Sequence, residues 1–341
     1  CTTQMPSGSN YPADSPQAMC ARDHLTLAMV QRDFFTNALA APDQLRQRVA
    51  WALSQIIVTS ANEQDLSYAH VMSRFQNILF QEAFGNYENL LLKVTYNPAM
   101  GNYLDMVNND RPAGARVPNE NYARELMELY SMGEGNYTEN DVRESARAFT
   151  GWRLTPPTKV QPPAGLSEKE RDEYLDQLWG AYEPAFVLNT KLHDSGTKTF
   201  LGQTGNWGGD DIVDIIMKQP ATARFITKRL FSEFAYRDPD PATIDRLVEV
   251  WNSSNHNVKA VVRAILTSDE FYSRRAYRAL VRSPLEFMVG AVRGLEVETD
   301  WLTVEQSAAG MDQRLYEPPS VAGWPGGEVW LSSGTFFGRV N

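Results

Sequence analysis

The sequence predicts a mainly α fold: a multi-helix globular bundle with a long irregular insertion at about 152–207 and an irregular, aromatic-rich C-terminal tail. Apolar residues recur at spacings of three and four over most of the chain, which is the helical period. Residues that start helices stand before several of these segments. Hydrophobic residues make up 43% of the chain and aromatic residues 11%, so there is enough apolar material for a large core.

The first part of the chain is predicted to form successive helices after an extended lead-in at 1–16, where turn-forming residues concentrate. A helical pattern covers about 17–40, and another helix follows it with Pro42 in its first turn. Further helical patterns lie at about 68–84, 87–95 and 97–107. The third helix, which Gly85 ends, has an apolar face formed by Tyr68, Val71, Met72, Phe75, Ile78 and Leu79.

The segment after Pro118 predicts an amphipathic helix that stops at Gly133 and Gly135. Its polar face carries Glu120, Asn121, Arg124, Glu125 and Glu128, and its apolar face carries Tyr122, Ala123, Leu126, Met127, Leu129 and Tyr130. Thr138 then offers an N-cap with Asp141 in the capping-box position, and the next helix runs to Gly151.

Residues 152–207 contain Pro156, Pro157, Pro162, Pro163 and Pro184 and predict irregular chain, with one short helix near 167–178 and a hairpin. A segment this long with little regular structure is usually functional or poorly ordered. The helical pattern returns from 208 to about 295, and the last 25 residues are rich in proline, glycine and aromatics.

Two domain organisations fit this pattern. Residues 17–341 form either a single helical domain or two packed lobes, 17–151 and 208–341, joined by the irregular 152–207 region. The chain length of 341 residues lies above the size at which one core usually stops growing, so it does not decide between them.

The formal net charge of −10 excludes some classes of partner. A nucleic-acid-binding protein normally has a basic stripe, and a protein that docks on anionic membranes needs positive charge. No apolar run reaches the roughly 18 residues of a membrane-spanning helix. The sequence also lacks the GxSxG, P-loop, GxGxxG and HExxH motifs and the di-iron pattern, which disfavours serine hydrolases, nucleotide enzymes and common metalloproteases.

The two cysteines, Cys1 and Cys20, leave three states open. They could form one local disulfide in an oxidising compartment, Cys1 could carry a lipid, or both could be free thiols. No Cys/His cluster is present that would form a structural zinc site.

The polar face after Pro118 is the first candidate site. Glu120, Arg124 and Glu128 are four residues apart, so each side chain reaches the next. One interpretation is a solvated face with two weak ion pairs. In the functional interpretation, Arg124 keeps one carboxylate, such as Glu125, ionised so that it can act as a base or a metal ligand. Asn121 on the same face would bind substrate.

His193 and Asp194 form a second candidate, in a glycine-containing part of the insertion. A His-Asp pair can serve as a base with its orienting group, or as metal ligands, and Lys198 could bind an anion. The alternative is a turn whose chemistry comes from the aspartate and glycine. No cofactor is required by the sequence; a divalent metal is the candidate, with Glu125, His193 and Asp194 as ligands.

Three tryptophans are candidates for substrate binding: Trp152 at the start of the insertion, and Trp324 and Trp330 in the tail. Exposed tryptophans often form platforms for sugars or partner proteins. In a proline-rich tail they more often pack onto the body of the protein and fix the terminus.

Six segments together resemble the bacterial domain-of-unknown-function 1800 family, in order and over about residues 43–341. They are "DQLRQRVAWALSQIIVTS", "NPAMGNYLD", "PNENYARELMELYSMGEGNYTENDVRESARAFTGW", "HDSGTKTFLG", "SPLEFMVGAVRGL" and "PPSVAGWPGGEVWL". The resemblance implies an exported protein with no settled activity, often encoded beside an exported, sulfatase-like family, domain of unknown function 1501. Members usually have further helices upstream, which favours a trimmed start at Cys1 over a lipid anchor.

The resulting functional hypothesis is an exported protein, periplasmic, cell-surface or extracellular, that binds or processes an extracellular polymer such as a glycan. A carboxylate/His site would carry this function. The alternative is a non-enzymatic surface or matrix component held in an assembly through its aromatic loops. Whether the protein is an enzyme is left open by the sequence.

Overall fold

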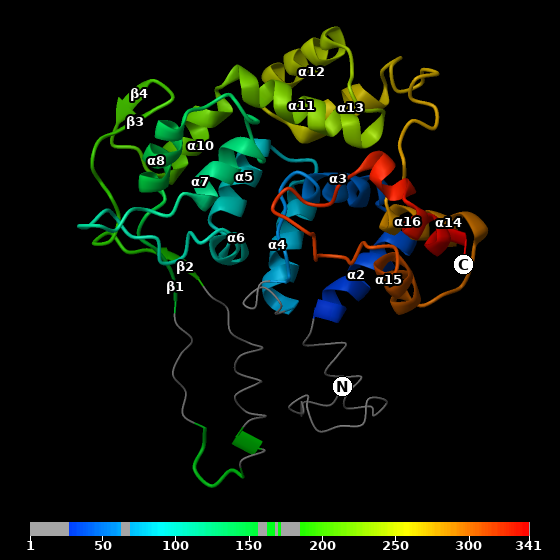
Figure 1. The fold of residues 1–341 in the computed structure, drawn as a ribbon, viewed down its shortest axis with the longest axis horizontal. Coiled ribbons are helices and arrows are strands. Elements are labelled where there is room, and N and C mark those ends of the chain that lie inside the picture. Colours follow the sequence, from blue (N-terminus) through cyan, green and yellow to red (C-terminus); the bar gives the residue numbers. More distant parts are fainter. Residues whose placement is uncertain (1–26, 63–68, 156–161, 168–169, 172–184, 341) are drawn as a thin grey trace.

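The computed structural model describes residues 27–62, 69–155, 162–167, 170–171 and 185–340. In these residues the chain forms fourteen α-helices, one short 3-10 helix and two small antiparallel sheets (Figure 1). The mainly α fold predicted from the sequence is confirmed. The lead-in at 1–16, Cys1, Cys20 and most of the helix expected near 167–178 lie outside the described residues.

The first seven helices are α2 (Leu27–Ala40), α3 (Gln44–Ser54), α4 (Ala69–Glu82), α5 (Tyr87–Thr95), α6 (Pro98–Tyr103), α7 (Asn121–Glu128) and α8 (Glu139–Ala148). The remaining helices are α10 (Gly209–Met217), α11 (Pro220–Phe234), α12 (Pro241–Ser253), α13 (Val258–Leu266), α14 (Pro284–Leu295), α15 (Trp301–Ala309), the 3-10 helix η2 (Gly327–Leu331) and α16 (Ser333–Val340).

Several helices begin where their side chains satisfy the first backbone N–H groups. The Thr138 hydroxyl accepts from Asp141 N while the Asp141 carboxylate accepts from Thr138 N, so the capping box predicted for α8 is present. Ser283 and Glu286 form the same arrangement at the start of α14. Pro284 occupies the first turn of that helix, where a missing N–H costs nothing.

The main hydrophobic core draws on helices from before and after the insertion. It extends from Val49 on α3 to Ile265 on α13 and includes buried residues of α4 to α8 and of α10 to α13. A smaller core joins α2, α14 and α15 around Phe35, Leu285 and Val304. Figure 1 shows α11 to α13 along one side and α2, α14 and α15 on another, with α3 and α4 between them.

The insertion contributes two short antiparallel sheets. β1 (Trp152–Leu154) pairs with β2 (Phe186–Leu188) in register Trp152 to Leu188. β3 (Lys198–Phe200) pairs with β4 (Gln203–Gly205) as a hairpin, and β3 packs on α8.

The C-terminal tail returns to the body of the protein. Trp330 in η2 is 4% exposed, and the Thr335 hydroxyl of α16 donates to its carbonyl at 2.7 Å. The buried indole of Trp330 therefore holds the tail against the body, and the Thr335 hydrogen bond orders the tail itself. Among the described residues, none of the helices combines the length and the apolar character needed to span a bilayer.

We predict that Tyr87→Phe lowers the free energy of unfolding. Tyr87 is fully buried, its ring lies 5.5 Å from that of Trp251, and its hydroxyl donates to Tyr130 O at 2.7 Å. The substitution keeps the ring but leaves a buried carbonyl without its donor, at a cost of about 1–2 kcal/mol. Guanidinium chloride unfolding measures it. Tyr272→Phe, at a side chain 77% exposed, is the control, and equal midpoints for the two variants would contradict the prediction.

Candidate functional site

The polar face of α7 is tied to α8. The Arg124 guanidinium donates to both carboxylate oxygens of Glu139 at 2.8 Å and to Glu120 at 3.2 Å. Glu128 accepts from the Tyr137 hydroxyl at 2.8 Å. These contacts give three of the candidate side chains a role in holding two neighbouring helices together.

The other two candidates of α7 differ from each other. Asn121 donates from its amide to Asp105 at 2.7 Å, so it has a partner on the preceding loop. Burial raises the pKa of the half-buried Glu125 carboxyl, the neighbouring Glu128 adds to the rise, and Arg124 opposes it. Glu125 thus favours its protonated form more than an exposed glutamate does.

The loop that carries His193 lies directly on the backbone of Gly151. This glycine has a φ of +88°, and a Cβ there would come within 2.8 Å of Asn189 O and of His193 N. Only glycine allows both the left-handed backbone and the close approach. The loop is fixed further because Asp194 N donates to the Thr150 hydroxyl at 2.8 Å, and His193 Nδ1 lies 2.9 Å from Thr150 O.

Asp194 is paired with Arg147 of α8. The Arg147 Nε donates to Asp194 at 2.7 Å, and its Nη1 donates to Glu144 at 2.9 and 3.0 Å. Burial alone would raise the pKa of Asp194, but the hydrogen bonds from Arg147 and from Gly196 N outweigh it and lower the pKa. The aspartate is therefore held ionised by the arginine.

Lys198 points into the same loop. Its side chain is buried, and its ammonium donates to Asp194 O at 2.6 Å and to Gly196 O at 3.0 Å. Burial lowers the pKa of this ammonium, and the Asp194 carboxylate opposes the change. Lys198 therefore holds this irregular loop closed by donating hydrogen bonds to backbone carbonyl groups of the loop.

The two predicted clusters occupy opposite ends of α8. Arg124 pairs with Glu139 at the start of the helix, and Asp194 pairs with Arg147 eight residues later, which corresponds to about 12 Å along the axis at 1.5 Å per residue. Across the described ranges, no group of three His, Cys, Asp or Glu side chains is arranged to hold a metal ion.

Trp152 belongs to a separate aromatic group. Its ring stacks on Phe186 with centroids 5.0 Å apart and lies 4.5 Å from Tyr96. The Tyr96 hydroxyl in turn donates to Asp210 of α10. The group fastens the first sheet to α5 and α10.

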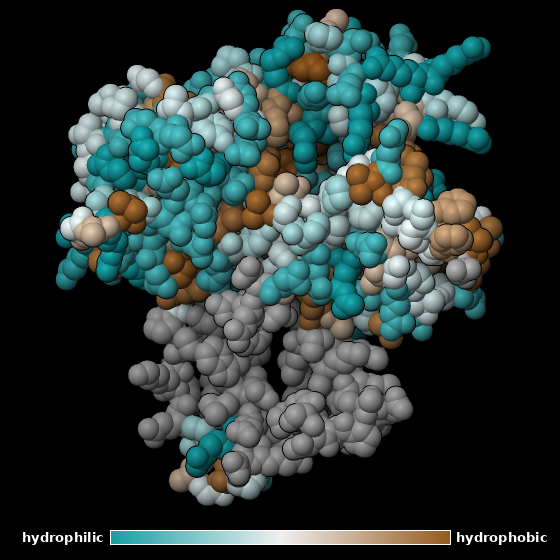
Figure 2. Space-filling view, viewed as in Figure 1, coloured by the Kyte–Doolittle hydropathy of each residue, from teal (hydrophilic) through white to brown (hydrophobic). Residues whose placement is uncertain are grey.

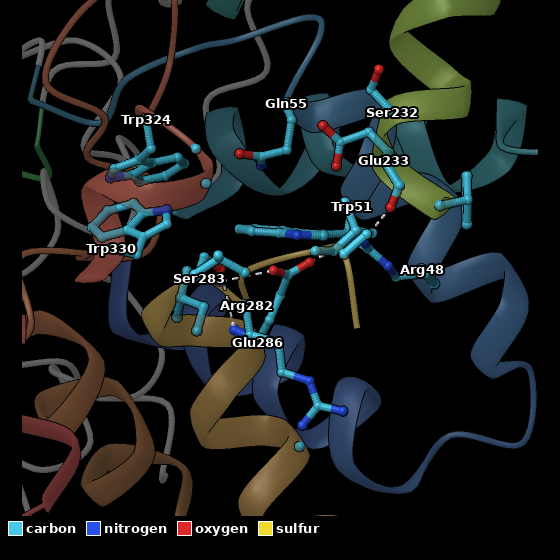
Figure 3. A pocket seen from close by; sticks show the side chains of 18 of the residues that line it. Arg48, Trp51, Gln55, Ser232, Glu233, Arg282, Ser283, Glu286, Trp324 and Trp330 are labelled. Carbon is cyan, nitrogen blue, oxygen red and sulfur yellow. Dashed lines mark hydrogen bonds and ion pairs between the residues drawn. The ribbon is translucent and has the colours of Figure 1, made fainter. Parts of the chain in front are cut away.

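The tail tryptophans lie in a different place, a large open groove that we call the tail groove. Its volume is about 1670 Å³, and it is lined by α3, the end of α11, the start of α14 and the tail around Trp324. Trp51 of α3 stacks with Trp324, with centroids 6.3 Å apart and planes at 30°. Figure 3 shows Trp324 and Trp330 on one side of the tail groove and Trp51 across its middle.

Arg48 connects the helices that line the tail groove. Its Nη2 donates to Glu233 O on α11 at 2.8 Å, and its Nη1 lies 2.9 Å from Glu286 on α14. Glu286 also accepts from Ser283 N at 2.9 Å, so both its oxygens are engaged. Figure 3 shows the Glu233 and Glu286 side chains on opposite sides of the Trp51 ring.

Glu233 has no such partner. In the part of the chain that the structure describes, its carboxylate makes no hydrogen bond, although it keeps some accessible surface in the tail groove. Burial raises the pKa of this carboxyl, Arg48 opposes the rise and Glu286 adds to it. The tail groove therefore contains a recessed carboxyl group that favours its protonated form more than an exposed glutamate does.

Sequence reasoning identified Trp324 and Trp330 but missed Arg48, Trp51 and Glu233. The available signal was Glu233 itself, a carboxylate between Phe231 and Phe234 on the largely apolar helix α11. The residues that surround it come from distant segments, so no local motif connects them.

We predict that Arg147→Ala lowers stability much more than Arg124→Ala. Arg147 and Asp194 keep 23% and 12% side-chain exposure, so removing the arginine leaves a largely buried carboxylate unpaired, at a cost of about 2–3 kcal/mol. Arg124 pairs with a glutamate that is 64% exposed, where solvent replaces the arginine. Urea unfolding measures both. A larger loss in Arg124→Ala would contradict the structural role assigned to the Arg147 pair.

Comparisons with known proteins concern the chain as a whole. No curated protein and no solved structure matches it. A family model described as a protein of unknown function, DUF1800, matches residues 3–341. The chain therefore belongs to the DUF1800 family of proteins of unknown function.

Proposed function

We propose that this protein binds a carbohydrate chain in the tail groove. The stacked pair of Trp51 and Trp324 beside the recessed Glu233 carries the proposal. The C–H faces of sugar rings pack on indole rings, and their hydroxyl groups need hydrogen-bond partners beside the ring. The tail groove offers both kinds of contact.

The size of the tail groove supports a polymer over a small molecule. Its volume of about 1670 Å³ exceeds the ~300–1,000 Å³ of pockets that enclose small ligands. An open groove of this size has room for several sugar units in a row. A chain could enter and leave without threading.

The carboxyl groups of the tail groove favour binding over hydrolysis. Glycosidases use two carboxyl groups on either side of the bond that they cleave, one as an acid and one as a base or nucleophile. Glu233 suits the acid, but both oxygens of Glu286 are engaged by Arg48 and Ser283 N. Glu233 therefore serves as a hydrogen-bonding partner of the bound chain, and burial, which raises its pKa, favours the protonated form that can donate.

The tail groove is a better candidate than the carboxylate/His cluster. Arg124, Asp194 and Lys198 each have protein partners that account for their positions. The Glu233 carboxylate makes no hydrogen bond among the described residues, although the charges of Arg48, Arg229 and Arg237 act on it. A polar group that makes no hydrogen bond and keeps accessible surface is available to a ligand.

The alternative, a component of a protein assembly, is favoured by one observation. The end of the chain exposes apolar side chains: Phe336 is 57% exposed, Phe337 64% and Val340 68%. Leu295 at the end of α14 and Val297 after it are exposed too, and Figure 2 shows apolar surface at the edge where Figure 1 places α14 and α16. Large exposed apolar patches mark protein contacts.

Export and a partnership with the sulfatase-like domain-of-unknown-function 1501 family are part of the same proposal. Their support is the family resemblance of the sequence. A glycan-binding groove suits a location where extracellular polymers are the ligands.

We predict that Trp324→Ala weakens glycan binding about two- to tenfold, because a stacked aromatic contact contributes about 0.5–1.5 kcal/mol beyond the area that it buries. Titration calorimetry with cello-, chito- and xylo-oligosaccharides, oligogalacturonate and sulfated dextran measures the effect. Tyr272→Ala, at an exposed aromatic that does not line the tail groove, is the control and should bind as the wild type does.

Equal affinities of the wild type and Trp324→Ala would contradict the assignment to the tail groove. If the wild type binds none of these probes and light scattering gives a mass above that of one chain, the assembly alternative is favoured.

We predict that binding weakens as the pH rises through the pKa of Glu233. Burial raises this pKa, so the neutral form that donates a hydrogen bond is fully present only below it. Glu233→Gln, which cannot ionise, should remove this pH dependence. Calorimetry at several pH values measures it, with Glu328→Gln, at an exposed carboxylate of the same groove, as control. A pH profile that Glu233→Gln leaves unchanged would contradict the prediction.

A further inference from the structure

The charge of the tail groove is opposite in sign to that of the whole chain. The protein has a formal net charge of −10, yet the tail groove is lined by six arginines, no lysine and four acidic residues. The six are Arg48, Arg229, Arg237, Arg275, Arg282 and Arg293. Cationic side chains are thus concentrated at one place on an acidic protein.

Four of the six arginines have partners within the protein. Arg48 pairs with Glu286, and Arg229 donates to Gln55 O at 2.6 Å. Arg275 pairs with Asp240 at 3.2 Å, and Arg293 donates to Ala38 O at 3.1 Å. Their contacts give them structural roles.

Arg237 and Arg282 differ from these four. Both side chains are exposed, and among the described residues neither guanidinium has a hydrogen bond or an ion pair. Both lie against glycines that line the tail groove. A Cβ on Gly327 would come within 2.8 Å of Arg237 Cζ, and one on Gly290 within 2.6 Å of Arg282 Nη1.

The four acidic residues of the tail groove offset its positive charge to different extents. Glu286 is neutralised by Arg48, and Asp238 lies 3.6 Å from Lys228. Burial raises the pKa of Glu233, while the charges of Arg48, Arg229 and Arg237 oppose the rise. Glu328 and Asp238 are both exposed, and Glu328 lies on the tail without an ion pair among the described residues.

We propose that the bound glycan is anionic, with carboxylate or sulfate groups on its sugar rings that Arg237 and Arg282 bind. The inference rests on the proposed function of the tail groove. A guanidinium presents parallel N–H donors that match a carboxylate or a sulfate, whereas a neutral sugar gains nothing from a full positive charge. Two arginines without a hydrogen bond or ion pair among the described residues, both in the lining of one groove, therefore select for acidic sugars over neutral ones.

The test compares matched charged and neutral probes. Calorimetry at constant ionic strength compares the affinity for oligogalacturonate with that for its methyl ester, and the affinity for dextran sulfate with that for dextran. Both pairs are needed because the same arginines can bind a carboxylate or a sulfate. The wild type should bind at least one charged probe about tenfold or more tightly than its neutral form, a typical effect of charge-assisted hydrogen bonds. The probe pair that shows this difference in affinity identifies the acidic group that the protein binds.

Three variants locate the effect. Arg282→Gln should reduce the preference for the charged probe, and Arg237→Gln/Arg282→Gln should remove it. Arg263→Gln, at an exposed and equally unpaired arginine of α13 outside the tail groove, should retain it. Thermal melting confirms that each variant is folded, and Arg282→Gln alone decides the matter if the double variant is not.

The outcomes separate the two proposals. Equal binding of charged and neutral probes would overturn the anionic ligand and leave glycan binding in the tail groove standing. A loss in Arg263→Gln as large as in Arg282→Gln would overturn the role of the groove arginines. No binding of any probe by the wild type would overturn the proposed function together with this inference.

Discussion

The position of Arg48 is the constraint on which the tail groove depends. One guanidinium joins three helices, because it extends from α3 to a carbonyl at the end of α11 and to Glu286 at the start of α14. It also lies 5.6 Å from the Phe234 ring. The guanidinium thus links α3 and α11, which contribute to the main core, with α14, which contributes to the smaller core. The floor of the tail groove is the surface that results.

The helices could be predicted because their signals are local. Thr138 and Asp141 are three residues apart, and the capping box that they form needs nothing from the rest of the chain. The tail groove could not be predicted because it has no such signal. Glu286 looks like an ordinary capping residue in the sequence, and Glu233 becomes distinctive only when Arg48 and Trp51 lie beside it.

The polar face of α7 shows why a dense polar motif is ambiguous. Its glutamates and arginine fit a reactive cluster, yet Arg124 reaches across to Glu139 on the next helix. The same holds for His193 and Asp194, whose apparent pairing in the sequence gives way to contacts with Thr150 and Arg147. Sequence spacing shows neighbours along one helix, but a partner on another element appears only in three dimensions.

The stacking of Trp324 on Trp51 has a consequence for the order of folding. The two rings lie near opposite ends of the chain, so their contact closes a very long loop and forms only after the tail has docked. During synthesis the tail is made after the helices of the core. A nascent chain thus lacks the finished groove, and a ligand that binds it selects completely folded molecules and holds their tails in place.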